Sequence, residues 1–130
     1  MSRDFKNIKA WRHADELTVA VYSATKYFPK EELYGVTSQL RRAAVSVPAN
    51  IAEGASRDHQ KEYLHFLNIA NGSTAEVTYL LHLSNRLGYL KDSDYTNLEQ
   101  MCAETAKTLY GLIKSVKKEI EETTTNSKFR

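Results

Sequence analysis

Glu62 and His65 form a Glu-x-x-His element, the pattern in this sequence that is closest to a metal-binding motif. In a four-helix bundle, two such elements and two further glutamates together hold a pair of iron or manganese ions. Elsewhere the chain has Glu99 followed three residues later by Cys102, so the second element is missing. The histidines also lack the spacing of metal ligands on one helix; they are His13, His59, His65 and His82. We therefore expect no metal and no cofactor.

Nucleophilic catalysis has no better support than metal binding. No serine stands in the glycine-flanked setting of a nucleophile elbow, and no glycine-rich loop is present to hold a phosphate. Cys102 falls in an apolar helical stripe, where a small buried side chain is its expected role. We therefore expect no catalytic residues, and a metal-dependent bundle enzyme is the least favoured of three hypotheses for function.

Basic residues gather in two stretches that a helical bundle would bring to the same end. They are Arg3, Lys6, Lys9 and Arg12 in the first stretch, and Lys114, Lys117 and Lys118 in the second. Beside Trp11, such a surface has the composition of a phosphate-binding site. The net charge of only +2 does not indicate a nucleic-acid binder. The alternative is that these residues aid solubility and favour the helix dipole.

A polar stripe on the stretch from Ser38 to Arg57, wound as a helix, is the second candidate site. At 100° per residue the stripe contains Gln39, Arg42, Ser46, Asn50, Glu53 and Arg57. Ser46 and Asn50 are short, whereas a freely solvated face favours long charged side chains. Our hypothesis is that Gln39, Arg42, Asn50 and Glu53 bond to another helix, through Glu76 or Ser73, or to a second subunit. The alternative is a half-exposed, solvated stripe.

Four amphipathic helices must position these residues, and no strand pattern appears. Apolar side chains recur every three or four residues over about 8–27, 33–55, 58–87 and 92–121. Pro29 ends the first segment and Gly88 the third. Long helices joined by short connections predict an all-α, antiparallel up-down four-helix bundle.

Pro48 and Gly72 depart from ordinary helix composition. Proline inside a helix costs about 3 kcal/mol, but Val47 and Ile51 keep the apolar phase across Pro48. The sequence therefore predicts a continuous helix that is kinked at Pro48. Gly72 costs about 1 kcal/mol relative to alanine, which a closely approaching neighbouring helix would explain.

Composition places the bundle in one domain without a membrane segment. With 130 residues the chain predicts a single domain at 1–120, followed by a disordered tail at 121–130 that has no apolar period. A single cysteine, no signal-peptide pattern and no apolar run of about 20 residues favour a cytoplasmic protein.

A family resemblance is carried by two segments, FPKEELYGVTSQLRRAAVSVPANIAEGASR and EYLHFLNIANGSTAEVTYLL. They resemble the four-helix bundle proteins encoded by intervening sequences in bacterial 23S rRNA genes. That family is similar to the accessory variability protein of diversity-generating retroelements. The resemblance covers about 5–120 and implies packing or assembly roles for Gln39, Arg41, Arg42, Asn50, Glu53, Gly54, Glu62, Gly72, Ser73 and Glu76.

What this resemblance implies is a small bacterial, cytoplasmic, non-enzymatic bundle that assembles into a homopentameric ring. The retroelement relatives imply contact with nucleic acid and a reverse transcriptase through a basic outer surface. Our leading hypothesis is a structural or adaptor protein with a basic end that contacts RNA or an RNA-bound partner. The alternative is a protein that binds the structured rRNA insertion directly.

Overall fold

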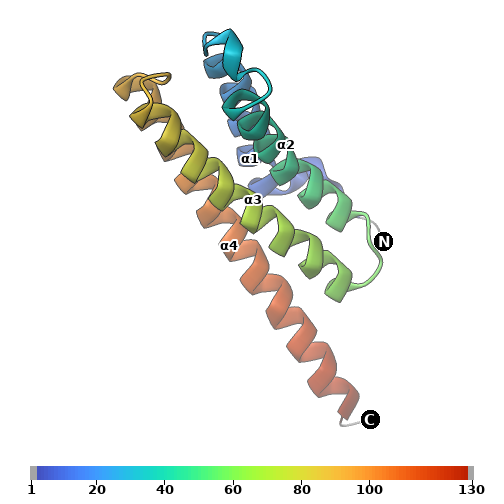
Figure 1. Ribbon diagram of the computed structural model, residues 1–130. Helices are drawn as coiled ribbons and strands as arrows, with labels where there is room; N and C mark the ends of the chain where they lie inside the picture. Colours follow the sequence, from blue (N-terminus) through green and yellow to red (C-terminus); the bar gives the residue numbers. More distant parts are fainter. Residues whose placement is uncertain (1–2, 129–130) are drawn as a thin grey trace.

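The computed structural model describes residues 3–128, which form four long helices, two short 3-10 turns and no β-strand (Figure 1). The helices are α1 (Lys9–Thr25), α2 (Val36–Ala55), α3 (Gln60–Arg86) and α4 (Asp92–Lys128). The 3-10 turns are η1 (Phe5–Asn7) and η2 (Lys30–Glu32). The predicted all-α class is confirmed.

Each long helix packs against two neighbours, in the order α1, α2, α3, α4 and back to α1. The start of α1 and the α2–α3 connection lie at one end, beyond which α4 continues (Figure 1). We call this the terminal end. The α1–α2 and α3–α4 connections lie at the opposite end, which we call the turn end (Figure 1). This arrangement is the up-down bundle expected from the short connections.

The core consists of two clusters of buried aliphatic side chains, one toward each end. Toward the turn end it includes Leu17, Val21, Leu40, Leu81 and Leu98. Toward the terminal end it includes Ala14, Val47, Ile51, Leu67 and Leu109. The apolar stripe of each predicted helix therefore faces the shared interior, which is the main source of the bundle's stability.

Helix α2 runs without a break through Pro48, as the apolar period predicted. Val47 and Ile51, on either side of the proline, are both fully buried. Burial of these side chains in the core offsets the hydrogen bond that the proline removes. The kink at Pro48 stays a prediction.

Glycines mark two of the helix ends. Gly88 has a φ of +79°, the left-handed conformation that favours glycine, and it follows the end of α3. Gly35 precedes α2 as its N-cap and is therefore a turn residue.

The predicted disordered tail is wrong for residues 121–128, which continue α4. The prediction relied on the missing apolar period, but a helix already formed over 92–120 adds residues without a new nucleation step. Thr123 and Thr124 also donate hydroxyl hydrogen bonds to the carbonyls of Glu119 and Ile120, at 2.9 and 3.0 Å. Residues 129–130 lie outside the described part of the chain.

Within residues 3–128, no helix combines the length and the apolar composition that crossing a membrane requires.

Candidate assembly face and nucleic-acid interface

The polar stripe of α2 meets α3 at its centre. The hydroxyls of Ser46 and Ser73 are hydrogen-bonded at 2.8 Å, and the amide of Asn50 donates to the Ser46 carbonyl at 2.8 Å and to its hydroxyl at 3.0 Å. All three side chains are half-buried. Ser73 is thus a partner of the stripe, as the hypothesis allowed, although it bonds Ser46 rather than Asn50.

The rest of the stripe lies on the surface of the chain. Gln39, Arg42 and Glu53 are exposed, as is Glu76 on α3. Their predicted hydrogen bonds to α3 are wrong for the described residues. The reason is that the core contacts of α2 leave only the centre of the stripe within reach of α3. Contact of these side chains with a second subunit stays a prediction.

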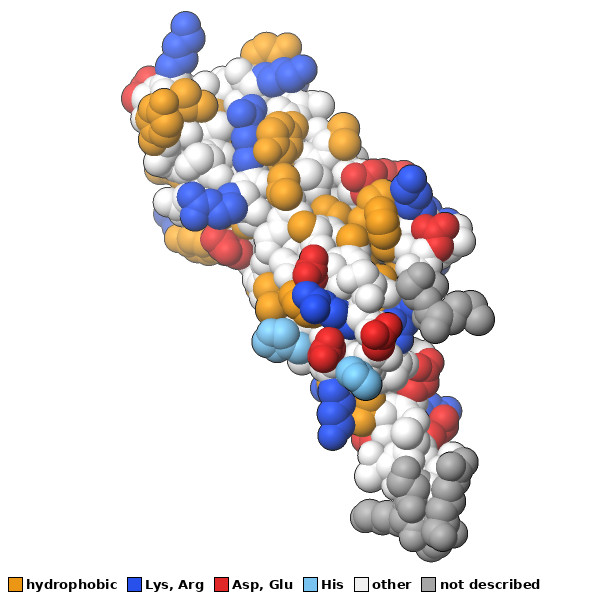
Figure 2. Space-filling view, turned by 90° about the vertical axis from the view of Figure 1, so that its right-hand side faces the viewer, with side chains coloured by type: hydrophobic (Ala, Val, Ile, Leu, Met, Phe, Trp, Pro, Cys, Tyr) orange, Lys and Arg blue, Asp and Glu red, His pale blue; other side chains and the backbone are white. Residues whose placement is uncertain are grey.

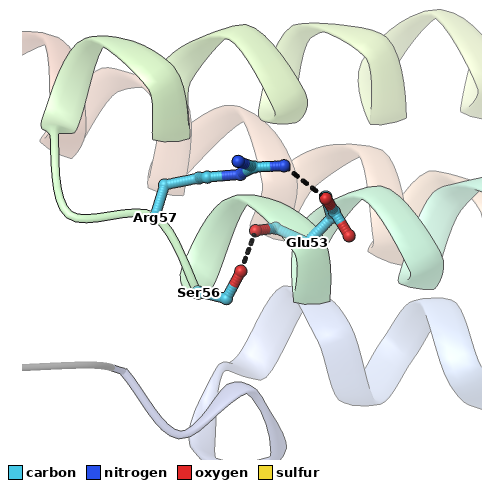
Figure 3. Close-up of polar contacts among 3 residues, drawn as sticks. All are labelled: Glu53, Ser56 and Arg57. Carbon is cyan, nitrogen blue, oxygen red and sulfur yellow. Dashed lines mark hydrogen bonds and ion pairs between the residues drawn. The ribbon is translucent and has the colours of Figure 1, made fainter.

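Glu53 has a local partner instead. Its carboxylate lies 2.5 Å from the Arg57 guanidinium one turn later, and Ser56 donates to its carbonyl oxygen at 2.7 Å (Figure 3). The side chains of Glu53 and Arg57 are 51% and 40% exposed. An exposed pair of this kind contributes about 0.3–0.5 kcal/mol.

Small and apolar side chains occupy the middle of the outer surface where α2 and α3 meet. We define the α2–α3 face as Gln39, Arg42, Ala49, Asn50 and Glu53 of α2, with Ile69, Gly72 and Glu76 of α3. Ala49 is exposed, and Ile69 is 40% exposed. A Cβ atom built on Gly72 would meet nothing within 4 Å. The middle of this face therefore lacks the long charged side chains of a typical solvated helix surface.

The two basic stretches lie at the terminal end, as the bundle topology predicted. Phe5, Ile8 and Trp11 from the start of the chain pack in the same cluster as Ile113 and Val116 of α4. The exposed cations around this cluster are Lys6, Lys9, Arg12, Lys114, Lys117 and Lys118. Nucleic-acid binding by these residues stays a prediction.

Arg3, the seventh predicted cation, has a structural role in this chain. Its guanidinium donates to the carbonyls of Ala55 and Arg57, at 3.4 and 3.1 Å, and bonds the Gln60 side chain. It also lies 4.2 Å from the centre of the Tyr63 ring. Arg3 therefore ties the N-terminal segment to the α2–α3 connection, and its place in the phosphate-binding set stays a prediction.

The pKa of the Tyr63 hydroxyl is shifted by its burial and by the charges of Arg3 and Glu119. Burial raises the pKa of its hydroxyl, the Arg3 charge lowers the pKa, and Glu119 raises it again. The net shift is upward, so the phenol stays protonated at neutral pH.

The sequence prediction missed two further cations at the terminal end. Lys61 lies in the first turn of α3 and is exposed, and Arg57 lies in the connection before α3, with its guanidinium 4.9 Å from the Phe66 ring centre. The antiparallel topology already placed the α2–α3 connection at this end, so the signal was available. Carboxylates are interleaved with these cations, and Figure 2 shows red and blue side chains mixed on the face in view.

Comparison with known proteins decides the family. The sequence matches the family described as 23S rRNA-intervening sequence protein over residues 6–111. The chain belongs to this family. A crystal structure of a Bacteroides thetaiotaomicron protein of unknown function from the S23 ribosomal protein family is similar, with 24% identity and a TM-score of 0.75. The match covers 81% of this chain and 98% of that one, and it shows the shared fold. Comparison with curated proteins gave no match.

In this member of the 23S rRNA-intervening sequence protein family, Gly54 packs tightly between α2 and α3. A Cβ atom there would lie 2.9 Å from the Phe66 Cβ and 3.0 Å from Cδ1 of Tyr63. The first distance is shorter than real contacts of a Cβ atom and the second is tighter than most of them, so the glycine permits the close approach of α2 and α3 beside their connection.

The Glu-x-x-His element of this family member lies on the surface of α3. Glu62 and His65 are both exposed, and the His65 ring packs edge-on against Phe66 at 5.5 Å. Among residues 3–128, no three His, Cys, Asp or Glu side chains converge as a metal site requires. The resemblance gives Glu62 a packing role, which its exposure in the single chain does not support.

Cys102 is the small buried side chain that its place in the apolar stripe predicted. Its exposed fraction is 2%. Burial is the main reason that the pKa of the thiol is raised to about 11. A hydrogen bond with Thr78 lowers the pKa, and the charge of Glu99 raises it by a smaller amount. A thiol in this state is a poor nucleophile at neutral pH.

Proposed function

We propose that this protein is a non-enzymatic homo-oligomer, five copies in a ring, that serves as a structural or adaptor protein in the bacterial cytoplasm. The ring and its subunit number follow the family resemblance. The α2–α3 face is the surface through which the copies meet, and Gly72 carries this assignment.

Gly72 lies inside α3, where glycine costs about 1 kcal/mol relative to alanine. Nothing within its own chain requires a glycine there, because a Cβ atom would point into open space. A helix of a second copy explains the residue, since the missing side chain lets two helix backbones approach closely. Ala49 and Ile69 then supply apolar area around the contact.

The charged residues of the α2–α3 face need partners in such a contact. An unpaired buried charge costs several kcal/mol, so Arg42, Glu53 and Glu76 must meet opposite charges or polar groups. A ring joins two different surfaces of neighbouring copies. The partners of these side chains therefore come from a different part of the next copy.

The test is the solution mass of the wild type and two variants, measured by light scattering. We expect an oligomer for the wild type and a smaller mass for Gly72→Arg. Gly111→Arg is the matched control, because Gly111 lies inside α4, is exposed and also has open space at its Cβ position. Both substitutions raise helix propensity, so loss of folding does not explain a lower mass.

Two results would overturn the proposal. One is a wild-type mass near the 14.8 kDa of a single chain at all concentrations tested. The other is an equal fall in mass for Gly72→Arg and Gly111→Arg, because added charge alone would then cause dissociation.

A second candidate function is direct binding of the structured rRNA insertion that the family description refers to. The observation in its favour is the group of exposed cations at the terminal end. Phosphate contacts by lysine and arginine release counterions, so such binding weakens steeply with salt. It requires no enzymatic step.

A labelled structured RNA tests this candidate. The triple variant Lys6→Glu, Lys9→Glu and Lys117→Glu is expected to weaken binding by about tenfold or more. The matched control reverses three other exposed cations, as Lys30→Glu, Arg86→Glu and Lys107→Glu. No binding at low salt, or an equal loss in both triple variants, contradicts the candidate.

A further inference from the structure

A groove of about 610 Å³ lies at the turn end, between the end of α1 and the start of α4. Its lining includes Ala20 and Ala24 of α1, Leu98 of α4, and residues 88–91 of the α3–α4 connection. The volume is in the range of small-molecule sites, which pair an apolar lining with a few polar groups. None of this groove belongs to the α2–α3 face or to the terminal end.

Tyr27 lines the groove with a side chain that is 89% exposed. Tyr27 lies two residues after the end of α1, next to Phe28, whose side chain is buried in the core. Pro29 follows and turns the chain. A solvent-exposed aromatic ring beside an apolar groove offers a flat surface for stacking, and every nucleobase has a π-face that can stack on it.

Tyr89 lines the same groove but is held in place. Its hydroxyl donates to the Glu32 carboxylate at 2.8 Å, and its ring packs against Phe28 at 5.8 Å. The hydrogen bond to Glu32 is the main reason that the pKa of Tyr89 is raised. One wall of the groove is thus fixed, whereas the Tyr27 ring is free to contact a ligand.

Polar groups of the groove match the remaining parts of a nucleotide. Asp94 and Asn97 are exposed, lie three residues apart on α4 and therefore share a face. A carboxylate and an amide offer the acceptors and donors that base edges require. Lys91 supplies a cation for a phosphate.

We propose that this groove binds a nucleobase that carries a phosphate. The base stacks on Tyr27, its edge faces Asp94 and Asn97, and its phosphate meets Lys91. The ligand is an unstacked base of single-stranded RNA or a free nucleotide, since both offer this chemistry. The site goes beyond the proposed ring and does not depend on it.

Two probes separate the sources: a labelled unstructured ten-nucleotide RNA followed by anisotropy, and the four ribonucleoside monophosphates followed by NMR shifts of labelled protein. We expect shifts confined to the groove, and a loss of affinity of about tenfold for Tyr27→Ala. Lys91→Glu is expected to weaken the phosphate contact and its salt dependence. If only the RNA binds, the ligand of the groove is a base of single-stranded RNA. If the monophosphates bind, the ligand is a free nucleotide.

Tyr34→Ala is the matched control, because Tyr34 is 92% exposed and lies outside the groove lining. It is expected to bind as the wild type does. Equal losses for Tyr27→Ala and Tyr34→Ala, or no groove shifts with either probe, would overturn the proposal. RNA binding that is lost in the Lys6, Lys9 and Lys117 triple variant but kept in Tyr27→Ala also overturns it, while leaving the second candidate function intact.

Discussion

Gly54 and Gly72 are the same residue type in opposite surroundings. Gly54 is buried against Phe66 and Tyr63 of α3, and Gly72 faces open space on α3. A side chain at the first position must displace Phe66 and Tyr63, whereas a side chain at the second meets nothing in its own chain. The two positions therefore separate the packing of one bundle from the proposed contact between copies.

Gly54→Ala is expected to lower the free energy of unfolding by about 1–3 kcal/mol, because the added methyl group overpacks the α2–α3 contact. Urea unfolding measures the change, with every variant at the same protein concentration. Gly111→Ala is the control, because Gly111 is exposed inside α4 and lies outside the α2–α3 face, and it should raise the unfolding free energy by up to about 1 kcal/mol. A Gly54→Ala protein as stable as the wild type would show that α2 and α3 separate at no cost.

Cys102 makes the stability of the fold depend on pH in alkaline solution. The unfolded thiol ionises near its ordinary pKa of 9.0, whereas burial keeps the folded thiol protonated up to about 11. The unfolded state loses its proton first, so the free energy of unfolding falls as pH rises through this window.

Cys102→Ala is expected to flatten that fall by up to about 1.4 kcal/mol per pH unit between pH 9 and 11. Thermal unfolding as a function of pH measures the slope. Part of the slope should remain above pH 10, because the pKa of Tyr63 is also raised by burial. Identical slopes for the variant and the wild type would contradict the burial of the thiol.

At the scale of elements, α4 combines a packed helix with an exposed extension. Val116 is buried and Ile120 half-buried, but residues 121–126 are exposed on every face. The extension depends on the packed part of α4 for its nucleation, whereas the bundle gains little apolar burial from the extension.

Truncation after Ile120 is therefore expected to change the unfolding free energy of the bundle by less than about 0.5 kcal/mol. Circular dichroism should show the loss of about two helical turns. A truncated chain that unfolds at much lower denaturant would mean that the extension packs on the bundle or on a neighbouring copy.

The N-terminal segment, in contrast, is tied to the bundle. Phe5 packs edge-on against Trp11 at 4.9 Å, and Arg3 bonds the α2–α3 connection. Arg3→Ala is expected to cost about 1–2 kcal/mol of stability, through lost hydrogen bonds and lost stacking on Tyr63. Urea unfolding followed by Trp11 fluorescence measures the loss. Arg3→Lys keeps the charge without the paired donors and should recover only part of it.

At the scale of the whole molecule, the two ends of the bundle differ in chemistry. The turn end exposes Tyr27, Leu33, Tyr34 and Leu87, each at least 48%. The terminal end exposes cations interleaved with carboxylates. If the second surface of the proposed ring contact also lies on a side of the bundle, both ends stay free, and the proposed nucleobase groove and the basic end are then accessible in the assembly.

Glu53→Ala distinguishes folding from assembly. In the single chain its removal should change the unfolding free energy by no more than about 0.5 kcal/mol, because it breaks one exposed ion pair with Arg57. In the proposed ring the same change removes a charge from a buried contact, so the oligomer should dissociate at a higher protein concentration than the wild type. Sedimentation over a dilution series measures this. Unchanged dissociation would place Glu53 outside the contact.

The sequence by itself determined the helices, the core and the order of packing. Apolar side chains at a spacing of three and four residues, such as Val47 and Ile51, lie on one face of a helix and are buried together when that face packs on its neighbours. Short connections make neighbouring helices antiparallel. That is why the continuity of α2 through Pro48 and the burial of Cys102 were predictable.

Only the tertiary structure decided which partner each polar residue and each glycine has. Ser73 meets the polar stripe but Glu76 does not, Arg3 bonds carbonyls more than fifty residues away, and Gly54 and Gly72 have opposite neighbours. The physical reason is that hydrophobic burial is non-directional and follows from local periodicity. A hydrogen bond or a close backbone approach depends instead on distances of a few tenths of an ångström between segments remote in sequence.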